Sequence, residues 1–134
     1  MDRPIPKPSE LDQQFWAATK QGKLLLQRCT TTGRYQWYPR AHSLFDPQGA
    51  VEWVESSGLG EVHTFTVVHR SLYPGLATPY VLVVVRLREG VLMTGHLRNI
   101  PDDQVRIGQL VRVAFENASD DIALPVFEPD SGGA

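Results

Sequence analysis

PYVLVVVRLREGVLMTGHLR, residues 79–98, carries the strongest structural signal in this chain. Its first half is rich in β-branched residues and alternates at period two, which predicts a strand rather than a helix. Val81, Val83, Val85 and Leu87 share one face, and the other face is also apolar until Arg86. Glu89-Gly90 interrupts the run, and Gly90 can supply the positive φ of a hairpin turn. A strand that is apolar on both faces predicts a closed or doubly covered sheet, such as a small barrel.

Further runs of strand type lie on both sides of this hairpin. They span residues 51–55, 61–70, 110–116 and 122–127, with turn formers between them. In the run 61–70, alternation places Val62, Thr64, Thr66 and Val68 on one face and His63, Phe65, Val67 and His69 on the other. About five strands with only one convincing helix predict a mainly β protein, with a five-stranded OB-type Greek-key barrel.

The N-terminal region predicts an extended arm followed by a short helix. Residues 1–8 contain three prolines, and Ser9 with Asp12 forms a capping pattern at the helix start. Phe15 and Ala18 fall on one face with Leu11, and Gly22 is placed to end the helix. Phe15, with Trp16 beside it, either covers the barrel or docks a partner, and the pattern leaves both readings open.

Between the helix and the strand at residues 51–55 the chain lacks a regular pattern. Residues 23–29 read as a short strand, and residues 30–49 are rich in turn formers with interspersed aromatic rings. We therefore divide the chain into an arm and helix (1–22), a lobe (23–50), a barrel (51–128) and a tail (129–134). Twenty irregular residues are long for a compact domain, so specific contacts must hold them.

The composition excludes several classes of protein. A chain of 134 residues with 42% hydrophobic residues can build one domain. A net charge of −2 and a pI near 6.0 give no electrostatic reason to expect nucleic-acid binding. The single cysteine excludes an internal disulfide, and the sequence offers no membrane span and no signal peptide. We expect a soluble cytoplasmic protein.

Four positions in the lobe have the spacing of a zinc ribbon but not its ligands. They are Cys29, Thr32, Ser43 and Asp46, spaced x2, x10 and x2. Hydroxyl groups are poor zinc ligands. Cys29, His42 and Asp46 could supply three ligands, but nothing in the sequence sets their geometry. We expect no zinc and no other cofactor. Apolar packing is expected to hold the lobe instead, with candidate rings at Tyr35, Trp37, Tyr38 and Phe45.

The sequence shows no catalytic motif. It lacks a nucleophile elbow and a phosphate-binding glycine loop, and Cys29 has no local partner that would activate it. Its best polar cluster for a ligand or a partner is His69, Arg70 and Tyr73 at a strand end, with Tyr80 closing the loop. Five arginines are candidates for an anion site, but acidic residues lie among them in the sequence and favour a solvated face. The five are Arg86, Arg88, Arg98, Arg106 and Arg112.

A series of motifs in one order resembles the DUF35 family. They are Phe15-Trp16-Ala17, residues 22–29 (GKLLLQRC), Gly33-Arg34, Pro39-Arg40, residues 67–70 (VVHR), Pro79-Tyr80-Val81 and residues 105–108 (VRIG). The similarity runs from about residue 11 to residue 127. It implies a rubredoxin-like zinc ribbon followed by an OB-fold, associated with acyl-CoA. Only Cys29 of the four zinc cysteines remains.

The resemblance also implies a role. Members of the family are non-catalytic partners of thiolase-like enzymes, including acyltransferases, thiolases and lipid-transfer-protein-like aldolases of steroid degradation. We therefore expect a hetero-oligomeric accessory subunit that stabilises its partner and helps to hold a CoA ester. Two alternatives stay open: a stand-alone protein that binds acyl-CoA through the loop 70–80, and a single-stranded nucleic-acid binder.

Overall fold

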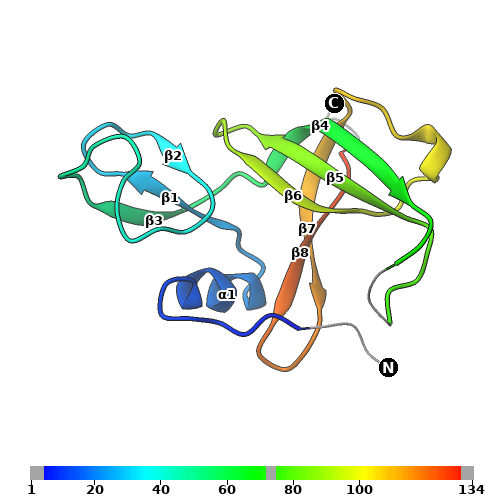
Figure 1. The fold of residues 1–134 in the computed structure, drawn as a ribbon, viewed down its shortest axis with the longest axis horizontal. Coiled ribbons are helices and arrows are strands. Elements are labelled where there is room, and N and C mark those ends of the chain that lie inside the picture. The colour runs from blue at the N-terminus through cyan, green and yellow to red at the C-terminus, as the bar shows by residue number, and fades with distance from the viewer. Residues whose placement is uncertain (1–4, 72–74, 131–134) are drawn as a thin grey trace.

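The structure is a computed structural model that describes residues 5–71 and 75–130. Its elements form a three-stranded sheet, a closed barrel and one α-helix that lies below and between them in the view of Figure 1. In chain order they are α1 (Gln13–Lys20), β1 (Leu25–Cys29), β2 (Tyr35–Gln36), β3 (Val51–Glu55), β4 (Leu59–Val68), β5 (Tyr80–Leu87), β6 (Leu92–Leu97), the 3-10 helix η1 (Asp102–Gln104), β7 (Leu110–Asn117) and β8 (Ala123–Pro129).

The five C-terminal strands close into a barrel in the order β4-β5-β6-β8-β7. Neighbouring strands are antiparallel except for β6 and β8, which pair in parallel at Leu97 and Phe127. The barrel closes where β4 pairs with β7, from Leu59 opposite Arg112 to Glu61 opposite Leu110. This topology confirms the predicted OB-fold within a mainly β protein.

The central hairpin also has the predicted form. In β5 every second residue is buried, from Val81 to Leu87, and the strand lies between β4 and β6. Gly90 adopts a φ of 99°, and its backbone N–H donates to the carbonyl of Leu87. The turn therefore uses the one residue of this loop that reaches a positive φ at little cost.

The predicted faces of β4 are wrong beyond Val62. Val62 pairs with Val85 but Thr64 pairs with Val84, so a β-bulge lies at His63. One extra residue reverses the alternation that follows. Thr64 is consequently exposed, whereas Phe65 and Val67 pack against the core.

The strand at residues 51–55 does not belong to the barrel. As β3 it pairs along its whole length with β1, from Leu25 opposite Glu55 to Cys29 opposite Val51. Our predicted boundary at residue 50 is wrong for this strand, because periodicity shows a strand but not its neighbour. The short β2, which we did not predict, covers the other edge of β1. Below, "the lobe" means residues 23–55.

Helix α1 fixes the lobe against the barrel. Gly22, with a φ of 77°, follows the helix as predicted, and its N–H donates to the carbonyl of Thr19. Phe15 is buried in the core, whereas Leu11 is exposed and does not share its environment as we expected. At the other end, Lys20 Nζ donates to Asn117 Oδ1 at 3.1 Å and to the carbonyl of Ser119 at 2.9 Å.

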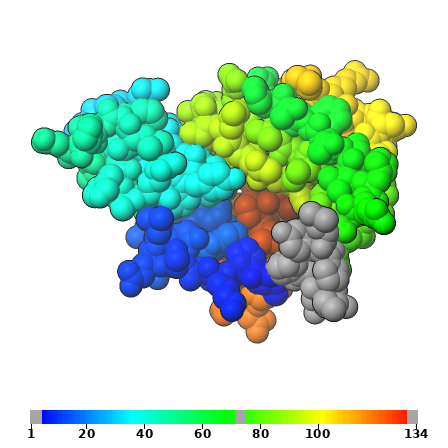
Figure 2. All heavy atoms as spheres, in the orientation of Figure 1, coloured from blue at the N-terminus to red at the C-terminus, as the bar shows by residue number. Residues whose placement is uncertain are grey.

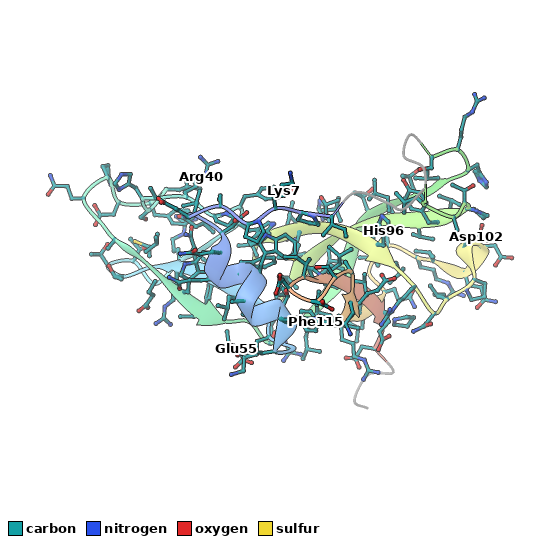
Figure 3. All side chains as sticks on the ribbon, turned by 90° about the horizontal axis from the view of Figure 1, so that it is seen from below. Lys7, Arg40, Glu55, His96, Asp102 and Phe115 are labelled. Atoms are coloured by element: carbon teal, nitrogen blue, oxygen red, sulfur yellow. The ribbon has the colours of Figure 1, made fainter. Side chains whose placement is uncertain are left out.

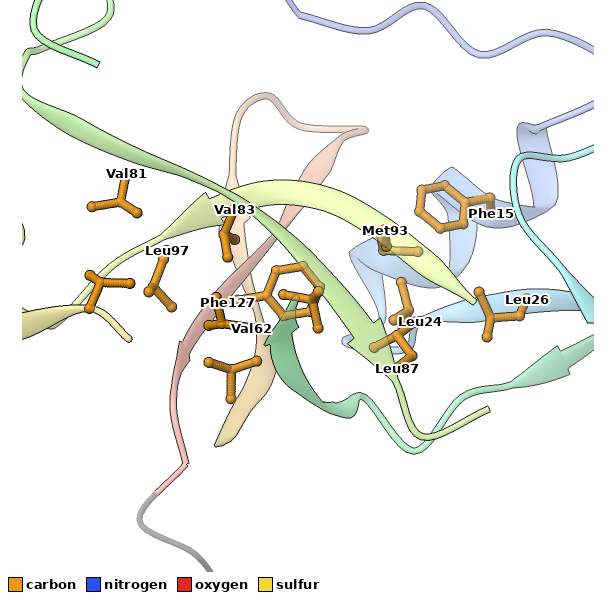
Figure 4. Close-up of a cluster of buried hydrophobic side chains, with 13 residues drawn as sticks. Phe15, Leu24, Leu26, Val62, Val81, Val83, Leu87, Met93, Leu97 and Phe127 are labelled. Carbon is orange, nitrogen blue, oxygen red and sulfur yellow. The ribbon is translucent and has the colours of Figure 1, made fainter. Parts of the chain in front are cut away.

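One hydrophobic core extends from the barrel into the lobe. Leu24 and Leu26, at the start of the lobe, join the same buried cluster as the barrel residues Val83, Leu87 and Phe127 (Figure 4). Burial of an aliphatic or aromatic side chain of this size contributes about 1.5–3 kcal/mol. The shared core therefore makes the lobe part of one folded unit with the barrel.

The junction between lobe and barrel is held by a carboxylate from the β5–β6 turn. Glu89 accepts hydrogen bonds from the Ser56 hydroxyl at 2.9 Å and from the Ser57 backbone N–H at 2.8 Å. Gly58 follows with a φ of 72°, and a Cβ there would lie 2.5 Å from Val113 Cγ1. Both its conformation and its contact with β7 therefore require glycine.

Candidate functional site

Three of the four zinc-ribbon positions, Cys29, Ser43 and Asp46, are linked by hydrogen bonds. Cys29 is fully buried, and its sulfur lies 3.3 Å from the hydroxyl of Thr31. The Thr31 hydroxyl donates to Asp46 Oδ2 at 2.6 Å, so it bridges the thiol and the carboxylate. Ser43 Oγ accepts from the backbone N–H groups of Phe45 and Asp46. The residues that replace the missing ligands therefore form part of a hydrogen-bonded cluster.

Hydroxyl donors around the sulfur change the acidity of Cys29. Hydrogen bonding from Ser43, and then from Thr31 and Thr32, lowers the pKa of the Cys29 thiol to about 6, against the opposing effect of burial. The same Thr31 contact, together with the Gln48 N–H, lowers the pKa of Asp46. Both groups are therefore stabilised in their deprotonated forms.

These residues do not fit a zinc ion. Structural zinc sites use four thiolate or imidazole ligands, and the cluster offers one thiol, two hydroxyls and a carboxylate. The Asp46 carboxylate is already occupied by the Thr31 hydroxyl and the Gln48 N–H. Across residues 5–71 and 75–130, no group of three or more His, Cys, Asp and Glu side chains could hold a metal.

Two buried glutamines hold the irregular part of the lobe. Gln27 and Gln36 lie opposite each other on β1 and β2, and each is only 2% exposed. Gln36 Nε2 donates to Gln27 Oε1 at 2.9 Å and to the carbonyl of His42 at 3.1 Å. Its Oε1 accepts from the Leu44 N–H at 2.9 Å, and Gln27 binds both the N–H and the carbonyl of Arg40. The two amides thus satisfy backbone groups that a loop would otherwise leave unpaired.

The aromatic rings of the lobe do only part of what we predicted. Trp37 packs against Phe15, with ring centroids 4.8 Å apart, and so joins the lobe to α1. Phe45 lies under the guanidinium of Arg34 at 4.0 Å. Tyr38, which stacks on Trp37, is 61% exposed, so it does not hold the lobe by burial.

The predicted loop cluster is only partly assembled in the described residues. His69 and Arg70 follow β4 and are exposed, and Tyr73 lies outside the described residues. Tyr80 begins β5 opposite Val68, and its ring stacks on His96 of β6 with centroids 4.6 Å apart. The structure therefore identifies His96 as a neighbour of Tyr80 that we did not predict. A search for ring pairs on adjacent strands would have indicated it.

The five arginines do not gather into one anion site. Arg86 lies 3.5 Å from His63 Nδ1, while Arg112 and Arg98 approach opposite oxygens of Glu128 at 3.1 Å and 3.9 Å. The side chains of Arg112 and Arg98 are 54% and 40% exposed, although that of Glu128 is only 17% exposed. The solvated-face interpretation fits these contacts.

A cavity lined by aromatic rings opens to solvent where α1, the lobe and the barrel meet. It has a volume of about 320 Å³. Its walls come from Asp12, Phe15 and Trp16, from the lobe residues 37–39, and from residues 93–96 of β6 and 124–126 of β8. In Figure 2 the orange-red surface of β8 is visible in a recess between the blue N-terminal segment, the cyan lobe and the yellow-green barrel strands. We call it the junction cavity.

A second cavity adjoins the junction cavity along the barrel. It has a volume of about 550 Å³, and its walls include residues 75–77, Tyr80, Arg98 and residues 116–118. His96 and Val126 line both cavities. In Figure 3, Arg40 of the lobe, Lys7 of the N-terminal arm and His96 follow one another along the same edge of the molecule. Sequence reasoning did not find either cavity, because their walls come from segments far apart in the chain.

None of the helices that the structure describes is long and apolar enough to cross a membrane.

Two family descriptions match consecutive parts of the chain. The ChsH2 rubredoxin-like zinc ribbon domain matches residues 16–43, and the ChsH2 C-terminal OB-fold domain matches residues 53–116. These matches agree with the order of lobe and barrel.

Two curated relatives are about one third identical to this chain over the aligned residues. A probable enoyl-CoA hydratase alpha subunit of Thermomonospora curvata is 33% identical over 128 residues, which cover 92% of this chain. The 3-oxo-4,17-pregnadiene-20-carboxyl-CoA hydratase alpha subunit of Mycobacterium tuberculosis is 34% identical over 125 residues, or 93% of this chain. The chain spans only 40% of the length of each of these two relatives.

A solved structure resembles the whole chain. A chain of an Ltp2-ChsH2(DUF35) aldolase superposes with a TM-score of 0.85 at 29% sequence identity. The match covers 93% of this chain and 98% of that one.

Proposed function

Because this chain belongs to the DUF35 family, we propose that it is a non-catalytic accessory subunit of a thiolase-like enzyme that acts on acyl-CoA substrates. The observation that carries this proposal is the likeness to the aldolase chain, which extends over 98% of that chain's length. The names of the two curated relatives, both alpha subunits of CoA-ester hydratases, support the same substrate class. An acyl-CoA-dependent partner also favours the cytoplasm as the place of assembly.

The surface of the described residues supports a role in association. Several large apolar side chains are exposed, including Tyr38 at 61% and Leu44 at 55% in the lobe. Both lie in the segment between β2 and β3, where they are available for contact with a partner protein.

Co-expression with a candidate thiolase-like partner tests the proposal. We expect the two to co-purify, and we expect the partner to be more soluble and more active on acyl-CoA with the chain than without it. The chain alone should turn over no acyl-CoA. A monodisperse monomer that changes neither the solubility nor the activity of that partner would contradict the proposal.

We further propose that the end of the barrel carrying His69, Arg70 and Tyr80 faces the CoA ester or the partner. Arg70 is exposed beside the loop, and Tyr80 lines the larger cavity. Arg70→Ala should raise the KM for acyl-CoA if Arg70 meets the ester, or weaken co-purification if it meets the partner. Arg106→Ala, at an equally exposed arginine lining a separate cavity, is the matched control. If Arg70→Ala changes neither the KM for acyl-CoA nor co-purification, this loop faces neither the ester nor the partner.

A further inference from the structure

The two adjoining cavities differ in character. Phe15, Trp16, Trp37 and Met93 line the junction cavity, and Phe15 and Met93 are themselves almost completely buried. Its polar side chains are Asp12, Tyr38, Thr94 and His96, and the apolar part of its surface is the larger. A space of about 320 Å³ with mainly aromatic and aliphatic walls lies within the range of small-molecule sites, roughly 300–1,000 Å³. Such a space favours an apolar group over water, because its walls offer few hydrogen-bond partners.

The larger cavity has a more polar lining. Tyr80, Arg98, Glu116 and Asn117 contribute polar groups to its walls. His96 lies at the boundary, where it lines both cavities and stacks on Tyr80 at 4.6 Å. An imidazole N–H at such a boundary can donate a hydrogen bond to a carbonyl oxygen of a ligand.

We propose that the two cavities form one binding site for an acyl thioester, with its apolar acyl group in the junction cavity. The polar carrier arm then runs past His96 into the larger cavity. This inference rests on the proposed function, because it takes the CoA ester as the ligand class. It goes further by assigning the acyl end to a surface that this chain builds from α1, the lobe and the barrel.

A small molecule accounts for the arrangement better than a partner's side chain does. An inserted apolar side chain would occupy the junction cavity but would leave the adjoining polar cavity unexplained. An acyl thioester has an apolar end joined to a long arm of amides and hydroxyls, and so matches both parts in order. Four separate segments wall the junction cavity, which also suits a ligand enclosed on several sides.

The three tryptophans provide a direct test with the full chain. Trp16 and Trp37 line the junction cavity, whereas Trp53 lies on β3 and is absent from its lining. Titration with octanoyl-CoA, followed by NMR of the indole N–H groups, should shift Trp16 and Trp37 saturably and leave Trp53 in place. Binding should strengthen by roughly tenfold for every two methylenes buried, so octanoyl-CoA should bind more tightly than butanoyl-CoA or CoA. No shift at about 1 mM octanoyl-CoA, or shifts independent of acyl length, would overturn the inference.

A blocking substitution locates the site. Thr94 is exposed on β6 and lines the junction cavity, so Thr94→Trp should fill the cavity without entering the core. The expected loss of affinity for octanoyl-CoA is about tenfold or more. Thr66→Trp, at an exposed threonine of β4 outside both cavities, is the matched control and should bind normally. Leu124→Trp enters the same cavity from β8 and should reproduce the loss.

Co-purification with the thiolase-like partner separates this inference from the proposed function. Thr94→Trp should reduce octanoyl-CoA binding while the complex still forms. Full affinity in both Thr94→Trp and Leu124→Trp would overturn the inference even if co-purification succeeds. If the chain binds acyl-CoA according to acyl length but never co-purifies with the partner, the proposed function is overturned and the binding site stands.

Discussion

The lobe and the barrel of this chain are held together in different ways. In the barrel, the buried side chains are almost all apolar, with Val83, Val85 and Val111 completely enclosed. In the lobe, the buried side chains include Gln27, Gln36 and Ser43, which act through hydrogen bonds. The barrel strands satisfy one another's backbone groups, whereas much of the lobe is loop and needs side chains for this purpose.

This difference shows how a ribbon-shaped lobe can be built without the usual metal ligands. Zinc ties distant loops together through four bonds at one point. Here Gln36 reaches the backbone of His42 and Leu44, and Gln27 reaches Arg40. Several hydrogen bonds spread over the loop therefore stabilise the lobe, where a zinc ribbon uses a single metal centre. Each net contribution is modest, about 0.5–1.5 kcal/mol, so the lobe depends on several at once.

The largest effect is expected from the barrel core. Phe127 is 1% exposed, and its ring packs against Gly95. Phe127→Ala should therefore destabilise the fold by about 3–5 kcal/mol through the cavity it leaves. Urea unfolding followed by tryptophan fluorescence measures the loss. Ile107→Ala, at a residue that is 70% exposed, is the control and should change stability by less than about 0.5 kcal/mol. Similar losses from both variants would argue against a core centred on the barrel.

A smaller and more local effect is expected from the glutamine pair. Gln36→Ala leaves the Leu44 N–H without its acceptor, at a cost of about 1–3 kcal/mol if that group stays buried, whereas Gln27 Oε1 keeps its bond from the Arg40 N–H. Hydrogen exchange should accelerate at Leu44 while Val83 in the barrel keeps its protection. Gln48→Ala, an exposed glutamine of the same lobe, should change neither. Equal acceleration in both regions would mean that the lobe is not a separate network.

The pH dependence of stability tests the thiol cluster. The pKa of Cys29 is lowered from 9.0 to about 6 on folding, so its contribution is complete above pH 9. That contribution should decrease as pH falls from 9 towards 6 and be absent below 6. Ser43→Ala removes the largest cause and should raise the thiol pKa, as read from thiolate absorbance with Cys29→Ser as the blank. An unchanged titration would exclude Ser43 as the donor.

The smallest effect is expected from metal removal. Because the lobe has one thiol among its four ribbon positions, EDTA should shift the melting temperature by less than about 1 °C. Elemental analysis after dialysis should find no stoichiometric zinc. The variant with Thr32→Cys, Ser43→Cys and Asp46→Cys restores four thiols and serves as the positive control. One zinc per unmodified chain would contradict the contrast between a metal-free lobe and the apolar barrel.

The barrel could be predicted from sequence because its signals are local. The alternation in β5 and the turn at Gly90 depend on neighbouring residues, and both were confirmed. The bulge at His63 could not be read in this way, since a bulge changes the pairing without changing the residue types. For β3 the pattern identified a strand, but its partner β1 is chosen by tertiary packing.

The candidate site was less predictable than the fold. Cys29, Thr32, Ser43 and Asp46 were found by spacing, but the glutamines that hold the loop were not, because an amide side chain carries no periodic signal. The junction cavity is formed by four segments that meet only in the folded chain. The loop residues His69 and Arg70 remain a prediction, and Tyr80 gains the stacked His96 that joins the two cavities.

The Glu89 contact with Ser56 and Ser57 has a consequence for assembly kinetics. A junction tied to the hairpin by two hydrogen bonds has little freedom to swing, so the lobe and the barrel would meet another protein as a preset shape. Such preorganisation slows dissociation more than it speeds encounter. Glu89→Gln would then shorten the residence time of a complex while leaving its association rate nearly unchanged.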